Sequence, residues 1–116
     1  MDFRDHMLAG GKEAHQWKTI NAGNFKVSIQ ASRYHYCSPR INSPNPFDYQ
    51  QFEVAIFTPD DHWVVPGYDI EATWADKFEN GVNGQRPRNS VAGYLTVDEV
   101  QQIVDDICNM GVKENE

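Results

Sequence analysis

Two stretches in which apolar and polar residues alternate limit most strongly what this chain can fold into. Residues 25–32 read Phe-Lys-Val-Ser-Ile-Gln-Ala-Ser, and residues 51–57 repeat the alternation with Phe, Val and Ile at every second position. A period of two is that of a β-strand with one buried face. Residues 58–61, Thr-Pro-Asp-Asp, suit a type I turn that leads into a third strand at residues 62–65. The sequence therefore predicts an antiparallel hairpin, with the strand at 25–32 in the same sheet.

Two segments with a helical period follow this hairpin. In residues 70–78, Ile, Trp and Phe recur every four residues, and Gly81 marks the end of the predicted helix. The last helix begins with Thr96-Val97-Asp98-Glu99, a capping box in which Thr96 and Glu99 bond each other's backbone amides. Apolar residues at positions 100, 103, 104 and 107 form a stripe that we expect to pack across the sheet, and Gly111 ends the helix.

The remaining segments are less regular. Residues 1–24 predict a loose N-terminal arm or a short helix, with a helical turn around residues 13–18, because a Gly-Gly pair interrupts any longer helix. Three prolines make residues 38–47 a loop, and residues 90–95 suit one further short strand. Residues 33–37 are aromatic-rich and could extend the strand at 25–32.

These elements predict an α+β fold with a three- or four-stranded antiparallel sheet. Helices pack on one face of this sheet, including the capped C-terminal helix. The chain has 116 residues, and we expect an N-terminal segment 1–24, one domain over 25–111 and a tail 112–116. No apolar run approaches the length of a membrane span, and no secretory signal is visible. Two cysteines are too few for a disulfide framework, so we expect reduced thiols and a cytoplasmic location.

Acidic charge is concentrated in the second part of the chain. Residues 1–47 carry a formal charge of +3, residues 48–95 carry −5 and residues 96–116 carry −5, within a total of −7. Phosphate backbones repel such a chain, so we expect no direct nucleic-acid binding. The same charge favours association with a Lys/Arg-rich protein surface. Asp105 and Asp106 also lie late in the predicted helix, where carboxylates are mildly destabilising, so helix stability does not explain them.

The acidic side chains are expected on turns and helix exteriors, where two interpretations stay open. They suit a solvated surface that keeps a small protein soluble. They also suit an electrostatic docking surface, in which Trp63, Tyr68 or Tyr94 supplies an apolar anchor. The residues expected to bind protein are Asp60, Asp61, Trp63, Asp98, Glu99, Asp105 and Asp106.

A second candidate site is a polar and aromatic cluster in the segment 33–40. It contains Arg33, His35, Tyr36, Cys37 and Arg40. On a regular strand residues two apart share a face, so the His35 imidazole could act as a base for the Cys37 thiol, with Arg33 lowering the thiol pKa. The arginines could instead converge with Arg86 and Arg88 on an anionic ligand. A buried packing role for both cysteines is the alternative, and with one closely spaced His/Cys pair no metal or cofactor is predicted.

Part of the chain resembles small proteins of phages and bacterial mobile elements. The resemblance lies in residues 28–40, Ser-Ile-Gln-Ala-Ser-Arg-Tyr-His-Tyr-Cys-Ser-Pro-Arg, and in residues 54–57 and 91–94, the last followed by a final helix. It carries no functional residue. It implies a phage or prophage setting, in which small acidic proteins, anti-CRISPR proteins among them, inhibit host defence complexes.

We therefore expect a non-enzymatic phage-type binding protein that inhibits or modulates a host defence complex through an acidic surface. Its expected partner is a host protein or protein–nucleic-acid complex with a basic surface, with no membrane contact, and a homodimer is compatible with the sequence. The alternative is a small enzyme or anionic-ligand-binding protein that uses the cluster of residues 33–40. A third interpretation is a structural component of a virion.

Overall fold

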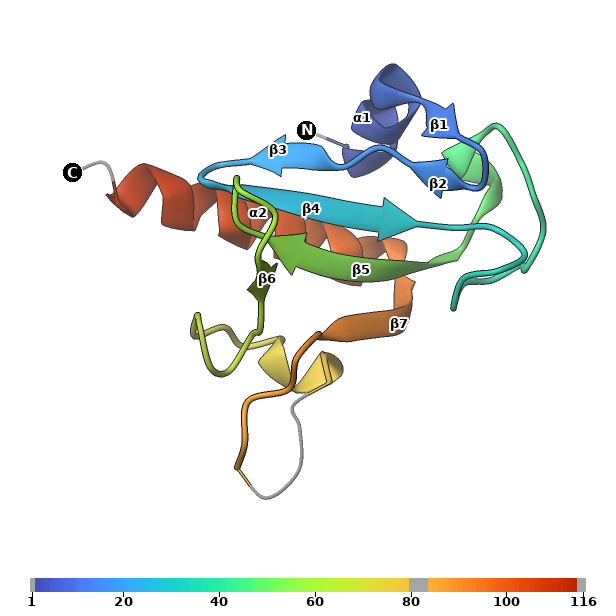
Figure 1. Cartoon of the computed structure of the whole chain (residues 1–116). Helices are drawn as coiled ribbons and strands as arrows, with labels where there is room; N and C mark the ends of the chain where they lie inside the picture. The colour runs from blue at the N-terminus through green and yellow to red at the C-terminus, as the bar shows by residue number, and fades with distance from the viewer. Residues whose placement is uncertain (1, 80–83, 115–116) are drawn as a thin grey trace.

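The computed structural model describes residues 2–79 and 84–114, with side chains up to residue 110. It has the mixed α+β architecture that the sequence predicts (Figure 1). The elements in chain order are α1 (Phe3–Gly10), β1 (Lys12–Glu13), β2 (Gln16–Trp17), β3 (Ile20–Ala22), β4 (Phe25–Gln30), the 3₁₀ turn η1 (Pro46–Asp48), β5 (Gln51–Phe57), β6 (Trp63–Val64), the 3₁₀ turn η2 (Ala75–Lys77), β7 (Val91–Thr96) and α2 (Val97–Glu114).

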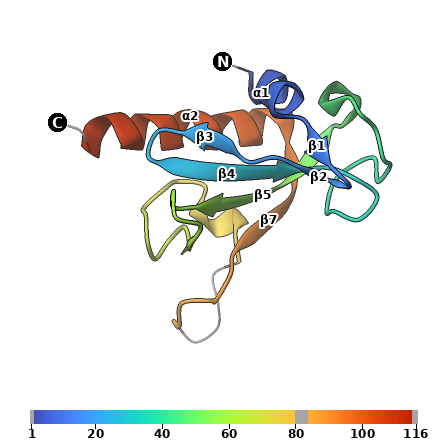
Figure 2. The same ribbon diagram turned by 45° about the horizontal axis from the view of Figure 1, so that its top comes forward.

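Strand β5 lies at the centre of a five-stranded antiparallel sheet. Strands β3, β4 and β5 pair in that order, and the other edge of β5 is shared by β7 and β6 (Figures 1 and 2). Ile29 is opposite Val54 and Ser28 is opposite Ala55, so the two alternating stretches are in register. The sheet has more strands than expected because residues 20–22 form β3, which is too short to show a period.

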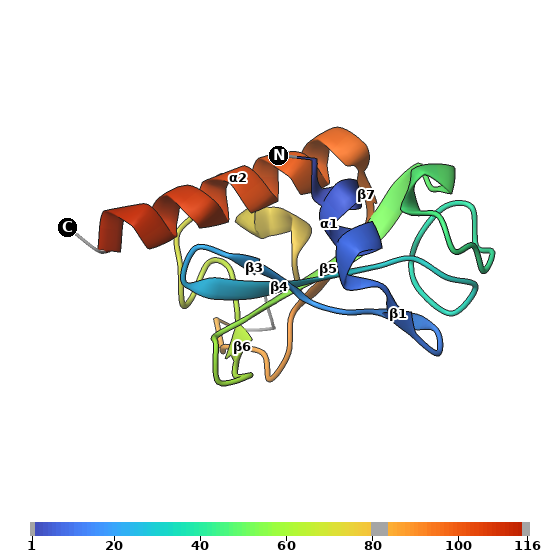
Figure 3. The same cartoon turned by 90° about the horizontal axis from the view of Figure 1, so that it is seen from above.

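Both helices cover the same face of this sheet (Figure 3). The predicted stripe of α2 is fully buried against it, namely Val100, Ile103, Val104 and Ile107. Helix α1 adds Phe3, whose ring meets the Phe52 ring edge-on with 5.1 Å between centroids. Burial of each of these side chains is worth about 1.5–3 kcal/mol. The opposite face carries no helix within the described residues, and it is therefore the open face of the sheet.

Helix α2 begins as the sequence predicts. The Thr96 N–H donates to Glu99 Oε1 at 2.9 Å, and the Glu99 N–H donates to Thr96 Oγ1 at 3.2 Å. The predicted end at Gly111 is wrong, because the helical backbone continues to Glu114. Asp105 and Asp106 therefore lie in the middle of α2, where the helix dipole has little effect on a carboxylate.

The helix predicted over residues 70–78 is also wrong, since only the short turn η2 forms there. A helix beginning at Ile70 needs the Ile70 carbonyl to accept from Trp74, but this carbonyl accepts from the Gly67 N–H at 2.8 Å. Trp74 and Phe78 are nevertheless buried. The four-residue spacing thus marks side chains that enter the core, and not a helix.

The N-terminal segment packs on the same core. Phe3, Met7 and Trp17 are buried in it. The helical turn predicted around residues 13–18 is wrong, because β1 and β2 form a hairpin there. A residue outside the hairpin fixes its position. The Gln30 side chain accepts from the Trp17 N–H at 2.8 Å and donates to the Trp17 carbonyl at 2.7 Å.

Candidate protein-binding surfaces

The predicted protein-binding residues lie on two different surfaces. Trp63 lies with Ala55 and Phe57 on the open face of the sheet, and Asp60 and Asp61 belong to the turn before it. The other four residues, Asp98, Glu99, Asp105 and Asp106, lie on α2, which covers the opposite face (Figure 3). The carboxylates of the second half of the chain therefore do not form one continuous acidic region.

The α2 carboxylates differ in how far their charge is compensated. Glu99 forms an ion pair with Lys77 at 2.7 Å, and this contact lowers the pKa of Glu99. Asp105 accepts from the Gln101 amide at 3.0 Å, and Asp106 accepts from the Gln102 amide and the Trp74 indole. Among the described residues, no cation lies within ion-pair distance of Asp98, Asp105 or Asp106. These three aspartates form the acidic face of α2.

The turn between β5 and β6 is less acidic than its sequence indicates. Asp61 forms an ion pair with Lys26 of β4 at 2.9 Å. Asp60 accepts from the Thr58 hydroxyl at 2.6 Å, which lowers the pKa of Asp60, and lies 3.3 Å from His62. This turn therefore adds less negative charge to a docking surface than α2 does.

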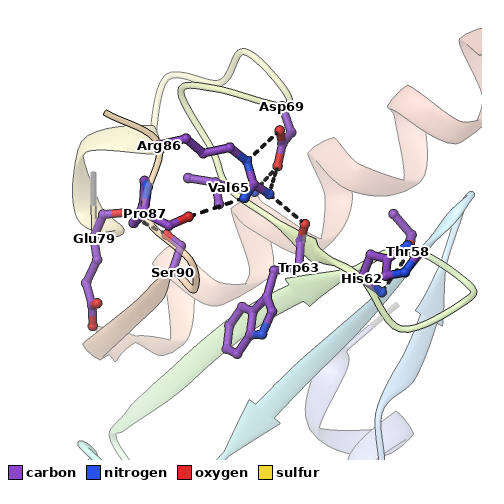
Figure 4. A network of polar contacts seen from close by, with 9 residues as sticks. All are labelled: Thr58, His62, Trp63, Val65, Asp69, Glu79, Arg86, Pro87 and Ser90. Atoms are coloured by element: carbon purple, nitrogen blue, oxygen red, sulfur yellow. Dashed lines mark hydrogen bonds and ion pairs between the residues drawn. The ribbon is translucent and has the colours of Figure 1, made fainter. Parts of the chain in front are cut away.

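Arg86 closes the free edge of β6 (Figure 4). Its guanidinium donates to the Trp63 carbonyl at 3.0 Å and makes two bonds to Asp69, at 2.7 and 3.1 Å. Asp69 in turn accepts from the Val65 N–H, and the bond from Arg86 lowers the pKa of Asp69. Two side chains thus satisfy backbone groups that a further strand would have paired with.

Arg86 is also remote from the arginines of the segment 33–40. It lies at β6, which pairs with the end of β5, whereas Ser38 pairs with Gln51 at the start of β5. The seven residues of β5 span about 20 Å. Arg86 therefore does not converge with Arg33 and Arg40 on one anionic ligand.

The cluster of residues 33–40 does not lie on a strand. Strand β4 ends at Gln30 and the chain then turns, with the Tyr34 N–H donating to the Ser32 hydroxyl at 3.0 Å. Cys37 is 1% exposed, and its thiol donates to the Ser32 carbonyl. Burial raises the pKa of Cys37. The expected shared face is therefore wrong, because Cys37 points into the core.

The other members of this cluster lie nearer to the surface. His35 is half-buried, its Nδ1 lies 2.7 Å from the Ser32 hydroxyl, and burial lowers the pKa of its imidazole, opposed by the charge of Glu53. Arg33, Tyr36 and Arg40 are exposed. The structure thus separates the inward Cys37 from the side chains that sequence reasoning grouped with it.

Sequence reasoning missed a groove of about 590 Å³ on the open face of the sheet. Its floor consists of outward-facing side chains of β4 and β5, and its sides consist of the β1–β2 hairpin on one side and β6 and β7 on the other. The polar positions of the two alternating stretches could have indicated which residues line it. Its lining includes Glu13, Lys18, His35, Glu53, Ala55, Phe57, Asp61 and Trp63.

Two exposed tyrosines adjoin the groove. Tyr36 is 55% exposed and Tyr94 is 47% exposed, with 5.9 Å between their ring centroids. The Tyr36 N–H donates to Glu53 at 2.9 Å, and the Tyr36 carbonyl accepts from the Tyr94 N–H at 2.9 Å. The sequence indicated Tyr94 as an apolar anchor. It did not indicate that Tyr94 lies beside Tyr36, because this contact depends on the turn that follows β4.

Comparison with known proteins gives no relative for this chain: no family model, no curated protein and no solved structure matches it. Within residues 2–79 and 84–114, no group of three His, Cys, Asp or Glu side chains is placed to hold a metal ion. No helix of this part of the chain is long and apolar enough to cross a bilayer. The fold and its surfaces define a class only: a small α+β module with a helix-covered face, an acidic helix and an open, grooved sheet face.

Proposed function

We propose that this chain is a non-enzymatic binding protein that docks on a Lys/Arg-rich surface of a host protein or protein–nucleic-acid complex, and inhibits or modulates it. The observation that carries this proposal is the acidic face of α2. Asp98 and Asp105 are exposed and Asp106 lies beside them, with amide and indole N–H groups as the hydrogen-bond donors to Asp105 and Asp106. Neutral donors leave the full negative charge of these two carboxylates in place.

The spacing of these carboxylates allows them to act together. Asp98 and Asp105 are seven residues apart, which places them on the same side of α2 and about 10 Å apart along its axis. This separation is close to the Debye length of about 8 Å at physiological ionic strength. A basic surface that approaches α2 therefore experiences a combined field, which accelerates association and weakens as salt is added.

The cellular setting belongs to the same proposal. The resemblance of residues 28–40 to phage and mobile-element proteins supports a phage or prophage origin, with a host defence complex as the target. Cys37 and Cys108 are free thiols, which suits the reducing cytoplasm of a host cell. The net charge of −7 supports a protein surface, and not nucleic acid itself, as the point of contact.

The test is capture from a bacterial host lysate by the tagged protein, followed by affinity measurement with the purified, identified partner at low and high salt. Asp98→Lys with Asp105→Lys reverses the acidic face and leaves Asp106, the acceptor of the Trp74 indole, intact. We expect this variant to bind at least about tenfold more weakly and with less salt dependence. Circular dichroism would verify its fold.

Glu71→Lys with Glu79→Lys is the matched control, because it changes the net charge equally at two exposed residues outside α2. This control should retain most of the affinity of the wild type. Unchanged affinity and salt dependence in the α2 variant would refute docking through the acidic face.

A further inference from the structure

The two ends of the open-face groove differ in chemistry. At the end of β5, Phe57 and Trp63 pack ring against ring with 4.6 Å between centroids and form an aromatic wall. Toward the start of β5, Glu53 places a carboxylate in the groove near His35. Phe57 is four positions after Glu53, which is about 13 Å at strand spacing. The groove thus offers an acidic end and an aromatic end at the spacing of residues i and i+4 of an extended chain.

The carboxylate at the acidic end has no ion-pair partner among the described residues. Glu53 accepts from the Tyr36 N–H, and no described Lys or Arg lies within ion-pair distance of it. Burial lowers the pKa of the nearby His35 imidazole, which disfavours a positive charge on it.

At the aromatic end the local charge is already balanced. Asp61, the acidic residue next to the aromatic wall, is paired with Lys26. Glu13 and Lys18, which are opposite in charge, lie on the other side of the groove, where the neighbouring Trp17 bonds to Gln30. Charge complementarity therefore favours a cation at Glu53 and a neutral group at the aromatic wall.

Tyr36 and Tyr94 form a preorganised platform beside Glu53. The Tyr36 N–H donates to the Glu53 carboxylate, and the Tyr36 carbonyl accepts from the Tyr94 N–H. Gly93 lets Tyr36 lie close to β7, because a Cβ on Gly93 would stand 2.7 Å from Tyr36 Cβ. Tyr94 has a φ of 56°, a left-handed conformation that aromatic residues rarely adopt and that often marks functional positions. A backbone held in this way loses little entropy on binding.

We infer that the open face binds an extended segment of a protein partner that carries an arginine, with its guanidinium at Glu53 beside the Tyr36–Tyr94 platform. An apolar side chain four residues away packs on Phe57 and Trp63, and the residue midway lies over Ala55. Arginine fits better than lysine because its planar guanidinium bonds a carboxylate through two N–H groups and stacks on aromatic rings. This inference rests on one part of the proposed function, namely that the partner is a protein. It does not depend on the acidic face of α2, because α2 lies on the other side of the sheet.

The test uses two peptides of defined composition as probes. They are acetyl-Ser-Arg-Thr-Val-Thr-Leu-Ser-amide and its reversed-order counterpart, because an extended chain can lie on a sheet face in either direction. Alternate side chains of a strand share a face, so Arg, Val and Leu meet the groove together. In a ¹⁵N-HSQC titration of the full chain, we expect shifts of the Glu53 amide and the Trp63 indole, and none at Asp105.

Two independent changes should weaken this binding about tenfold. One replaces arginine in the peptide by citrulline, its neutral isostere, and leaves the protein unchanged. The other is Glu53→Gln, which removes the charge while its carbonyl still accepts from the Tyr36 N–H. Combining them should cause little further loss, since both remove the same contact. Glu71→Gln, the same change at an exposed residue outside both surfaces, is the matched control and should bind like the wild type.

Four outcomes would overturn the inference. The first is equal affinity for the arginine and citrulline peptides, and the second is no shift with either peptide at millimolar concentration. The third is a set of shifts confined to α2, which would mean that the peptide binds the acidic face and not the groove. The fourth is a concentration-dependent shift of the open face without peptide, together with dimers in sedimentation, because a second copy would then occupy the groove. The variant Asp98→Lys with Asp105→Lys should still bind the peptide even where it no longer captures the partner. The two proposals can therefore fail separately.

Discussion

Gly93→Ala is the most direct test of how Tyr36 is seated on the sheet. The added Cβ would stand 2.7 Å from Tyr36 Cβ, closer than real Cβ atoms approach, so Tyr36 must move. Two hydrogen bonds hold Tyr36: its N–H donates to the Glu53 carboxylate, and its carbonyl accepts from the Tyr94 N–H. Each is worth about 0.5–1.5 kcal/mol net, so their loss costs about 1–3 kcal/mol. The usual gain when Gly becomes Ala is about 0.4–1 kcal/mol, so mid-range values of both effects give a net loss of about 1.3 kcal/mol.

Thermal and urea unfolding, followed by circular dichroism, measure this loss. For a chain of this size, 1 kcal/mol corresponds to about 4 °C in Tm, so we expect a decrease of about 5 °C. Gly10→Ala is the matched control, because the nearest atom to its added Cβ is Lys18 Cβ at 3.7 Å and alanine favours a helix. This control should be neutral or slightly stabilising.

A double-mutant cycle with Tyr36→Gly assigns the cause. Without a Cβ at position 36 the close contact is absent, so Gly93→Ala should cost much less in the Tyr36→Gly background. A Gly93→Ala variant as stable as the wild type would refute the seating of Tyr36 against β7. The same conclusion would follow if its cost were unchanged without the Tyr36 side chain.

Three further predictions concern the cap of α2, the buried thiol and the edge of β6. Thr96→Ala should lower the free energy of unfolding by about 1 kcal/mol, because it removes the acceptor of the Glu99 N–H, and urea unfolding would show this. Cys37 should react with a thiol reagent at pH 7 far more slowly than Cys108, and rapidly only in denaturant, because Cys37 is buried with a raised pKa. Fast reaction of the folded protein at Cys37 would instead favour the enzyme alternative. Arg86 lowers the pKa of Asp69, so this carboxylate stabilises the fold above its unfolded pKa of about 3.9 and loses that contribution as the pH falls through its folded value. Asp69→Asn should therefore be less stable than the wild type at pH 7, and the difference in urea midpoint should shrink near pH 3.

The elements that could be predicted from the sequence are those whose causes are local. The capping box of Thr96 and Glu99 forms between residues three apart, and the alternation of residues 25–30 and 51–57 reflects one buried face. The failed helix over residues 70–78 depended on a contact that no local pattern shows, since the Ile70 carbonyl is taken by Gly67. In the same way, the β1–β2 hairpin is held by Gln30, which lies outside it.

In the candidate sites too, features with local causes could be predicted and features that depend on distant contacts could not. Helical periodicity was sufficient to expect Asp98 and Asp105 on the outside of α2. The direction of the Cys37 thiol required the turn at Ser32, and that turn depends on a side-chain hydrogen bond to the Tyr34 amide. The alternation predicted which side chains face away from the core, but not that this face stays uncovered. An open sheet face follows from where the helices pack, which is a property of the whole chain.

The separation of the two surfaces predicts that their contributions to binding are additive. The sheet lies between the acidic face of α2 and the groove, and packed layers are about 10 Å apart, so Asp105 and Glu53 share no contact. For a partner that reaches both, Asp105→Asn should act mainly on the association rate and Glu53→Gln mainly on the dissociation rate, because the first acts through the field and the second through a direct contact. The double variant should then lose the sum of the two free energies to within about 0.5 kcal/mol. A larger coupling energy, measured by surface plasmon resonance on all four proteins, would mean that the partner or the sheet links the two surfaces mechanically.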